Sequence, residues 1–169
     1  MARLESRALA GYYPFPEHLL PALASLVSFG EERARWAPAN IFEVADPCAG
    51  DGSAILGLLS AWRHWRVTAT TEWANRRASV SWRMPEFRLR AIELDHRRFE
   101  SLHDHVRQAA ANAAINTDSS AMLGDAGRWL RQGASRWCHL LYLNPPYDTH
   151  HVHKREEAAW LVEWLPRMV

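Results

Sequence analysis

The chain has 169 residues, 48% of them hydrophobic, which is enough to bury the core of one ordinary domain. A formal net charge of only +1 excludes a chain that binds nucleic acid through bulk positive charge, and two cysteines exclude a disulfide-rich fold. No apolar run approaches the roughly 18 residues of a membrane span, and the N-terminus has no signal-peptide pattern. The sequence therefore predicts a single cytoplasmic domain, 1–169, with no membrane contact.

Helical and extended patterns alternate along the chain. We expect strands at 42–45, 90–94, 121–123 and 139–143. We expect helices at 15–29, 53–61, 95–114, 128–132 and 156–164. Ser53 and Asp95 have side chains suited to cap the second and third of these helices. The alternation predicts an α/β fold with a mostly parallel sheet and helices on both of its faces.

The segment 61–90 is unusual because it separates Gly52 from Glu93 by more than the ~20 residues typical of such a unit. It is rich in two residue types: Trp62, Trp65, Trp73, Trp82, Arg63, Arg66, Arg76, Arg77, Arg83, Arg88 and Arg90. Arg interleaved with aromatic side chains is typical of a nucleic-acid groove. An inserted surface hairpin or loop whose Trp residues cover core edges explains the pattern as well, and we favour that interpretation.

A glycine-rich turn joins the first predicted strand to the helix after it. It reads Asp46-Pro47-Cys48-Ala49-Gly50-Asp51-Gly52. Strand, glycine-rich turn and helix form the layout of a nucleotide-type site, in which Gly50 and Gly52 let the backbone bend sharply and approach a ligand. The turn is not G-x-G-x-x-G and has no P-loop Lys, which disfavours a dinucleotide or a triphosphate. Asp46 suits a ligand that carries a positive ammonium group.

The last predicted strand runs into Asn144-Pro145-Pro146-Tyr147, where two prolines end the sheet and stiffen the backbone. Asn144 Oδ1 and the Pro145 carbonyl can each accept a hydrogen bond from an exocyclic NH2 group, and Tyr147 can stack on the ring that carries it. The alternative explanation is a Pro-Pro loop that only ends a strand. The tetrapeptide alone does not decide between the two.

In this order the two motifs resemble the class I S-adenosylmethionine-dependent methyltransferases, and most closely the amino-methyltransferases that act on adenine N6 in DNA. The segment Gly11-Tyr12-Tyr13-Pro14-Phe15-Pro16-Glu17 is similar to the one that precedes the cofactor loop in the subgroup with this motif order, where a Thr usually stands in place of Phe15. The resemblance implies S-adenosylmethionine as the cofactor and a Rossmann-like sheet. It implies these cofactor-binding residues: Tyr13, Asp46, Pro47, Cys48, Ala49, Gly50, Gly52, Glu93, Leu94 and Asp125.

The resemblance also implies roles within the site. It assigns Glu93 to the ribose hydroxyls and Leu94 to the adenine face. Asp125 either accepts a hydrogen bond from the adenine amine or is a turn aspartate between two glycines, and the sequence leaves both open. The catalytic residues would be Asn144, Pro145, Pro146 and Tyr147, with no metal.

An aromatic amine is a poor nucleophile, and the sulfonium of the cofactor is already an activated donor, so positioning would carry much of the catalysis. DNA is the expected substrate and partner, and a base in a duplex would be flipped out to reach the pocket. Two alternatives stay open. Asn-Pro-Pro-Tyr also occurs in enzymes that methylate RNA or protein glutamine, and the chain could be a non-catalytic binding module that retains the fold.

The chain ends about 22 residues after Tyr147, so we expect the C-terminal strands of the family to be missing. The first strand should lie centrally, between the second and the fourth. The open edge beyond the fourth strand is then expected to be covered by the helix at 156–164, or to bind a partner chain or a second copy.

Overall fold

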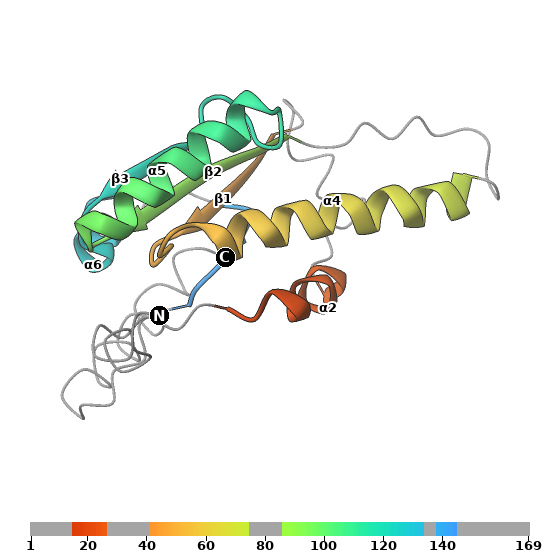
Figure 1. Ribbon diagram of the computed structural model, residues 1–169, viewed down its shortest axis with the longest axis horizontal. Helices are drawn as coiled ribbons and strands as arrows, with labels where there is room; N and C mark the ends of the chain where they lie inside the picture. The colour runs from red at the N-terminus through yellow and green to blue at the C-terminus, as the bar shows by residue number, and fades with distance from the viewer. Residues whose placement is uncertain (1–14, 27–40, 75–85, 134–137, 145–169) are drawn as a thin grey trace.

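The computed structural model describes residues 15–26, 41–74, 86–133 and 138–144, and only the backbone of 65–74 and 130–133. In chain order the elements are η1 Glu17–Leu19, α2 Leu20–Leu26, β1 Ile41–Asp46, α4 Ser53–Ala74, β2 Glu86–Glu93, α5 His96–Ala111, β3 Ser120–Leu123, α6 Ala126–Gly133 and β4 Leu140–Leu141 (Figure 1). Strands and helices alternate from β1 onward, which confirms the predicted α/β fold.

The four strands form one sheet in the order β3-β2-β1-β4, and all its pairings are parallel. β1 lies centrally: it pairs with β2 from Ile41↔Glu86 to Asp46↔Ala91 and with β4 at Val44↔Leu140. The prediction that the first strand lies between the second and the fourth is confirmed. Because all strands run the same way, their carboxyl ends meet at one edge, where ligands of open α/β sheets bind.

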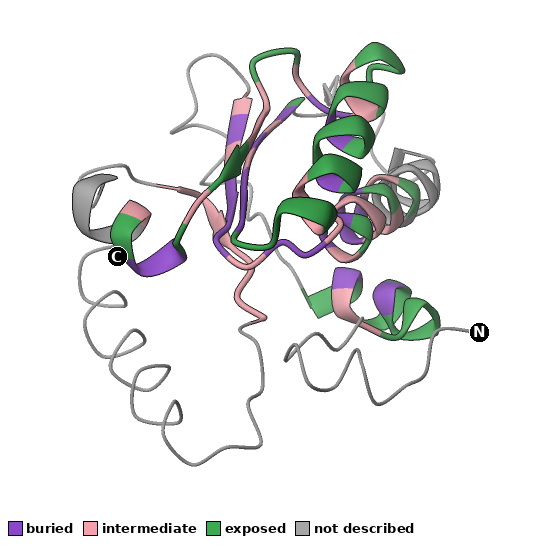
Figure 2. Cartoon of the chain, turned by 60° about the vertical axis from the view of Figure 1, so that its left-hand side comes forward, coloured by how far each residue is buried: buried purple, intermediate pink, exposed green. Residues whose placement is uncertain are grey.

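α4 and α5 pack on one face of the sheet, and α2 packs against α4, so that the three helices together bury the core. Buried and less buried residues alternate along the first part of β1 and β2, as expected when one face lies against helices, and the last three residues of each strand are all buried. The Phe42 and Phe87 rings meet edge to face at 6.4 Å, and the Trp62 ring of α4 meets Phe87 at 5.2 Å. The other main members of this core are Leu20, Ala24, Val44, Ile55, Leu58, Leu59, Leu89, Ala91, Leu102 and Val106. Figure 2 shows α4 and α5 on this side of the strands and α6 on the other.

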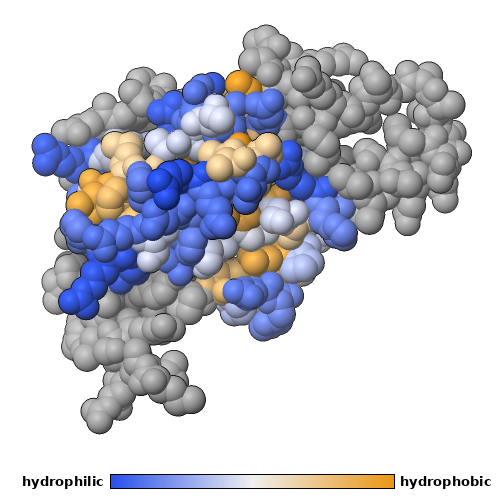
Figure 3. Space-filling model, turned by 45° about the horizontal axis from the view of Figure 1, so that its top comes forward, coloured by the Kyte–Doolittle hydropathy of each residue, from blue (hydrophilic) through white to orange (hydrophobic). Residues whose placement is uncertain are grey.

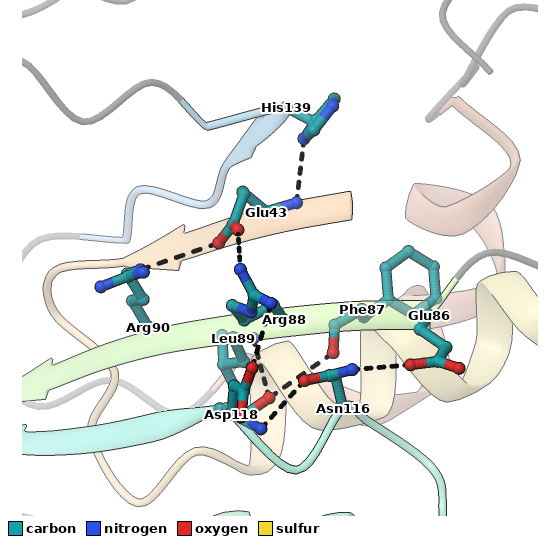
Figure 4. Close-up of polar contacts among 10 residues, drawn as sticks. Glu43, Glu86, Phe87, Arg88, Leu89, Arg90, Asn116, Asp118 and His139 are labelled. Carbon is teal, nitrogen blue, oxygen red and sulfur yellow. Dashed lines mark hydrogen bonds and ion pairs between the residues drawn. The ribbon is translucent and has the colours of Figure 1, made fainter. Parts of the chain in front are cut away.

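The opposite face of β1 and β2 carries a charged network (Figure 4). Arg88 donates to Glu43 Oε1 at 2.7 Å and to Asp118 Oδ2 at 3.1 Å, and Arg90 Nε lies 3.7 Å from Glu43 Oε2. The network joins β1, β2 and the loop before β3. Two arginines that the sequence placed in a possible nucleic-acid groove therefore belong to the sheet, where they pair with carboxylates.

The segment 61–90 is largely regular structure, so the interpretation as an inserted hairpin or loop is wrong where the chain is described. α4 continues to Ala74, and β2 begins at Glu86, four residues earlier than predicted. No Gly or Pro lies between Gly57 and Pro85, so nothing in the sequence stops the helix at Ala61. Residues 75–85 lie outside the described part of the chain.

Other boundaries differ by less. The predicted helix at 15–29 is a short 3-10 turn followed by α2, and the fourth strand is Leu140–Leu141 rather than 139–143. Ser53 does not cap α4: it is the first helical residue, and Asp51 Oδ1 accepts bonds from its N at 3.0 Å and its Oγ at 2.7 Å. Asp95 caps α5 as predicted, because its Oδ1 accepts the Arg98 N–H at 3.0 Å, and this bond lowers the Asp95 pKa.

A partner chain or a second copy is predicted to bind at the open edge of the sheet beyond β4. On the face shown in Figure 3 the described surface is mostly hydrophilic, with apolar patches between polar side chains. At the β3 edge, Met122 and Leu123 are exposed. Among the described strands β4 pairs with β1 alone, and the helix expected to cover its other side, 156–164, lies outside the described residues. Association at that edge stays a prediction.

Candidate functional site

The loop after β1 is fixed against the carboxyl edge of the sheet by backbone bonds. Ala49 N donates to the Ile92 carbonyl at 2.9 Å, and Gly52 N donates to the Ala49 carbonyl at 2.9 Å. Gly50 and Gly52 have φ values of 60° and 81°, a region that L side chains rarely adopt. The loop that the sequence predicted to approach a ligand is thus a tight turn that needs both glycines.

Replacing Gly52 by Ala should destabilise the fold. A Cβ there would lie 2.7 Å from Leu102 Cδ1, which is buried in the core, and the positive φ adds backbone strain. We expect a loss of about 1–3 kcal/mol, which lowers Tm by roughly 2–4 °C per kcal/mol in a thermal melt. Gly124→Ala is the matched control, because a Cβ there meets nothing within 4 Å. Equal melting temperatures for the two variants would contradict this account of the turn.

Asp46, the last residue of β1, is a buried carboxylate with 1% of its surface exposed. Its burial raises its pKa to about 7. The Cys48 N–H, which donates to Asp46 Oδ1 at 3.1 Å, opposes this rise, and the negative charge of Glu93 adds to it. A carboxylate held this way gains from a nearby cation, since a positive charge favours its ionised form.

Glu93, the last residue of β2, is also buried, with 6% of its surface exposed. Its Oε1 accepts three donors: Asp95 N at 2.7 Å, Arg98 Nη2 at 2.9 Å and Arg98 Nε at 3.2 Å. Its Oε2 accepts no hydrogen bond from the described residues. A ribose hydroxyl at this position would therefore bond to Oε2.

The neighbouring residues Leu94 and Asp125 lie at the same edge. Leu94 is 68% exposed, which leaves its side chain open to a ligand. Gly124 N donates to the Glu93 carbonyl at 2.9 Å, so the loop after β3 is fixed to the end of β2. Asp125 Oδ1 accepts the Arg128 N–H at 2.6 Å and caps α6. Asp125 thus has a structural contact as a helix cap, and its role toward an adenine amine stays a prediction.

Asn144 follows β4 on the same edge. Tyr142 N donates to the carbonyl of Ala45 at 2.9 Å, which places the chain leading to Asn144 beside the residue that precedes Asp46. The Phe15 ring meets the Tyr142 ring edge to face at 6.5 Å, so the upstream segment reaches the strand that leads to Asn144. Four predicted site residues, Tyr13, Pro145, Pro146 and Tyr147, lie outside the described residues.

Two residues that contact this edge were not predicted from the sequence. Arg98 pairs with Glu93. The sequence feature that could have indicated this pair is an acidic and a basic residue on either side of the helix cap Asp95. His105 of α5 has its Nδ1 2.8 Å from the Asp51 carbonyl, which joins that helix to the turn after β1. No sequence signal indicates the second contact, because it depends on how α5 packs.

The fold and this edge together define an α/β protein with a parallel, Rossmann-like sheet and a candidate ligand site at its carboxyl ends. No family model matches the chain, and no curated protein is significantly similar to it. In the described part of the chain, no three His, Cys, Asp or Glu side chains are grouped to hold a metal ion. None of the described helices has the length and apolar character needed to cross a bilayer.

Proposed function

We propose that this protein binds S-adenosylmethionine at the carboxyl edge of the sheet and transfers its methyl group to an exocyclic amine, with adenine N6 in DNA as the acceptor. The observation that carries the proposal is the adjacency of β1 and β4. It brings the strand end with the Asp46 loop next to the strand that leads into Asn144. Two motifs that are distant in the sequence thereby share one edge.

The residues at this edge have the chemistry that such a cofactor needs. Asp46 supplies a buried negative charge for a cationic group, Glu93 Oε2 can accept a hydroxyl, and the exposed Leu94 can pack on a planar ring. The tight turn at Gly50 lets the backbone approach the ligand closely. This donor set fits an adenosyl group with an amino-acid tail better than it fits a polyphosphate, because two buried carboxylates would repel phosphate.

The chain's own contribution to the reaction would be positioning. When bound, the cofactor supplies an activated methyl group on a sulfonium. Asn144 Oδ1 and the Pro145 carbonyl would accept hydrogen bonds from the acceptor NH2, which orients its lone pair. Tyr147 would stack on the acceptor ring. The proton can leave the amine after transfer, so the pocket needs no strong base.

Transfer of a radiolabelled methyl group tests the proposal. The full chain is incubated with methyl-labelled S-adenosylmethionine and, separately, with duplex DNA, RNA and protein. We expect label in DNA, recovered as N6-methyladenine after digestion. Label in RNA or in protein glutamine would move the acceptor to that class. Cofactor binding without transfer to any of them would make the chain a binding module, and absence of binding would refute the proposal.

A further inference from the structure

The Arg98 side chain makes a two-nitrogen contact with a single oxygen of Glu93. Both Nη2 and Nε donate to Oε1, at 2.9 and 3.2 Å. Oε1 also receives the Asp95 N–H at 2.7 Å, so this oxygen is saturated. Three donors on one oxygen fix the carboxylate and leave Oε2 as the oxygen that can bond to a ligand.

The position of Arg98 in the helix argues for a role at this edge. It lies in the first turn of α5, where the helix dipole disfavours a cation. Its side chain nevertheless pairs with the buried Glu93 and is itself about three-quarters covered. The Arg98 charge compensates the buried charge of Glu93, at the strand end next to Asp46, whose pKa is raised first by its own burial and further by Glu93.

We propose that Arg98 is a positioning residue for the ligand: it holds Glu93 Oε1 so that Oε2 accepts the hydroxyls of a ribose. The inference rests on the proposed cofactor and deepens it, since it makes recognition of the ribose hydroxyls depend on a helix residue that does not itself contact the ligand.

The test compares two ligands by calorimetry on the full chain: S-adenosylhomocysteine, and its analogue that lacks both ribose hydroxyls. The wild type should prefer the hydroxylated ligand by roughly 10- to 100-fold, the range expected for hydrogen bonds to a charged group. Arg98→Gln should reduce this preference to about threefold or less, because it lowers the affinity for the hydroxylated ligand and hardly changes the affinity for the analogue. Arg98→Lys keeps the charge without the planar fork and should give an intermediate preference.

Arg97→Gln is the matched control, because it removes the same charge from the adjacent, exposed position. It should keep the wild-type preference. If Arg98→Gln weakens both ligands equally, or keeps the wild-type preference, the positioning role is wrong while the proposed function stands. If Arg98→Gln does not fold, Arg98→Lys decides, and a wild-type preference in that variant overturns the inference. If the wild type binds both ligands equally, Glu93 does not recognise the ribose hydroxyls, and this inference is wrong. A wild type that binds neither refutes the proposed function itself.

Discussion

Replacing Asn144 by Ala should lower methyl transfer by about 100-fold or more, the scale seen when one preorganised polar contact to a reacting group is removed. The affinity for S-adenosylmethionine should change little, because Asn144 follows β4 whereas the proposed cofactor contacts in the described chain lie at or just after the ends of β1, β2 and β3. A loss confined to turnover identifies a group that orients the acceptor amine. Single-turnover transfer of labelled methyl and calorimetry on the same preparations measure the two effects.

Asn112→Ala is the control for this experiment. Asn112 is an exposed asparagine at the C-terminal end of α5, away from the carboxyl edge of the sheet. It should leave both transfer and affinity at wild-type values. An Asn144→Ala chain with full turnover would refute the acceptor role of the amide. Loss of cofactor binding in that variant would instead move Asn144 into the cofactor site.

The layout of the sheet was predictable because it depends on local patterns. The strands are short apolar or alternating segments, and the connections between them are long enough for crossover helices, which favours parallel pairing. Parallel pairing then places Asp46, Glu93 and Asn144 at one edge before any side-chain contact is known. That step required only the order of motifs and the rule that such sheets bind ligands at their carboxyl ends.

The contacts that depend on packing were not predictable. The pairing of Glu43 with Arg88 requires the register of β1 on β2. Arg63 of α4 donates to the carbonyls of Ala113 and Ala114, a contact that requires the relative position of two helices. The length of α4 was missed for a different reason: the helix as a whole has little amphipathic pattern, so periodicity gave no signal of where it ends.

Asp46 should make folding stability depend on pH in a particular direction. Its folded-state pKa is about 7, against an ordinary value of 3.8. The folded state therefore holds a proton that the unfolded state releases between these two values. The contribution of the protonated carboxyl is fully present below about pH 4, decreases as the pH rises, and is lost above about pH 7. Three units of pKa correspond to roughly 4 kcal/mol.

Asp46→Asn should consequently be more stable than the wild type at pH 8, by up to roughly that amount. The amide can keep the bond from Cys48 N to its side-chain oxygen without the buried charge. The stability difference between the two chains should be small near pH 4 and reach a plateau above pH 7, as measured by urea unfolding across this range. Asp104→Asn, the same change at an exposed position on α5, should show no such rise.

Asp46→Asn should also weaken the binding of S-adenosylmethionine at pH 8, because it removes the buried negative charge assigned to the cationic end of the ligand. A binding site that holds an unfavourable charge until a ligand compensates it exchanges stability for affinity. The two effects of Asp46→Asn are therefore linked: the variant should melt at a higher temperature without ligand and gain less from added cofactor. A variant that is stabilised and still binds as tightly as the wild type would show that Asp46 is buried for a reason other than the ligand.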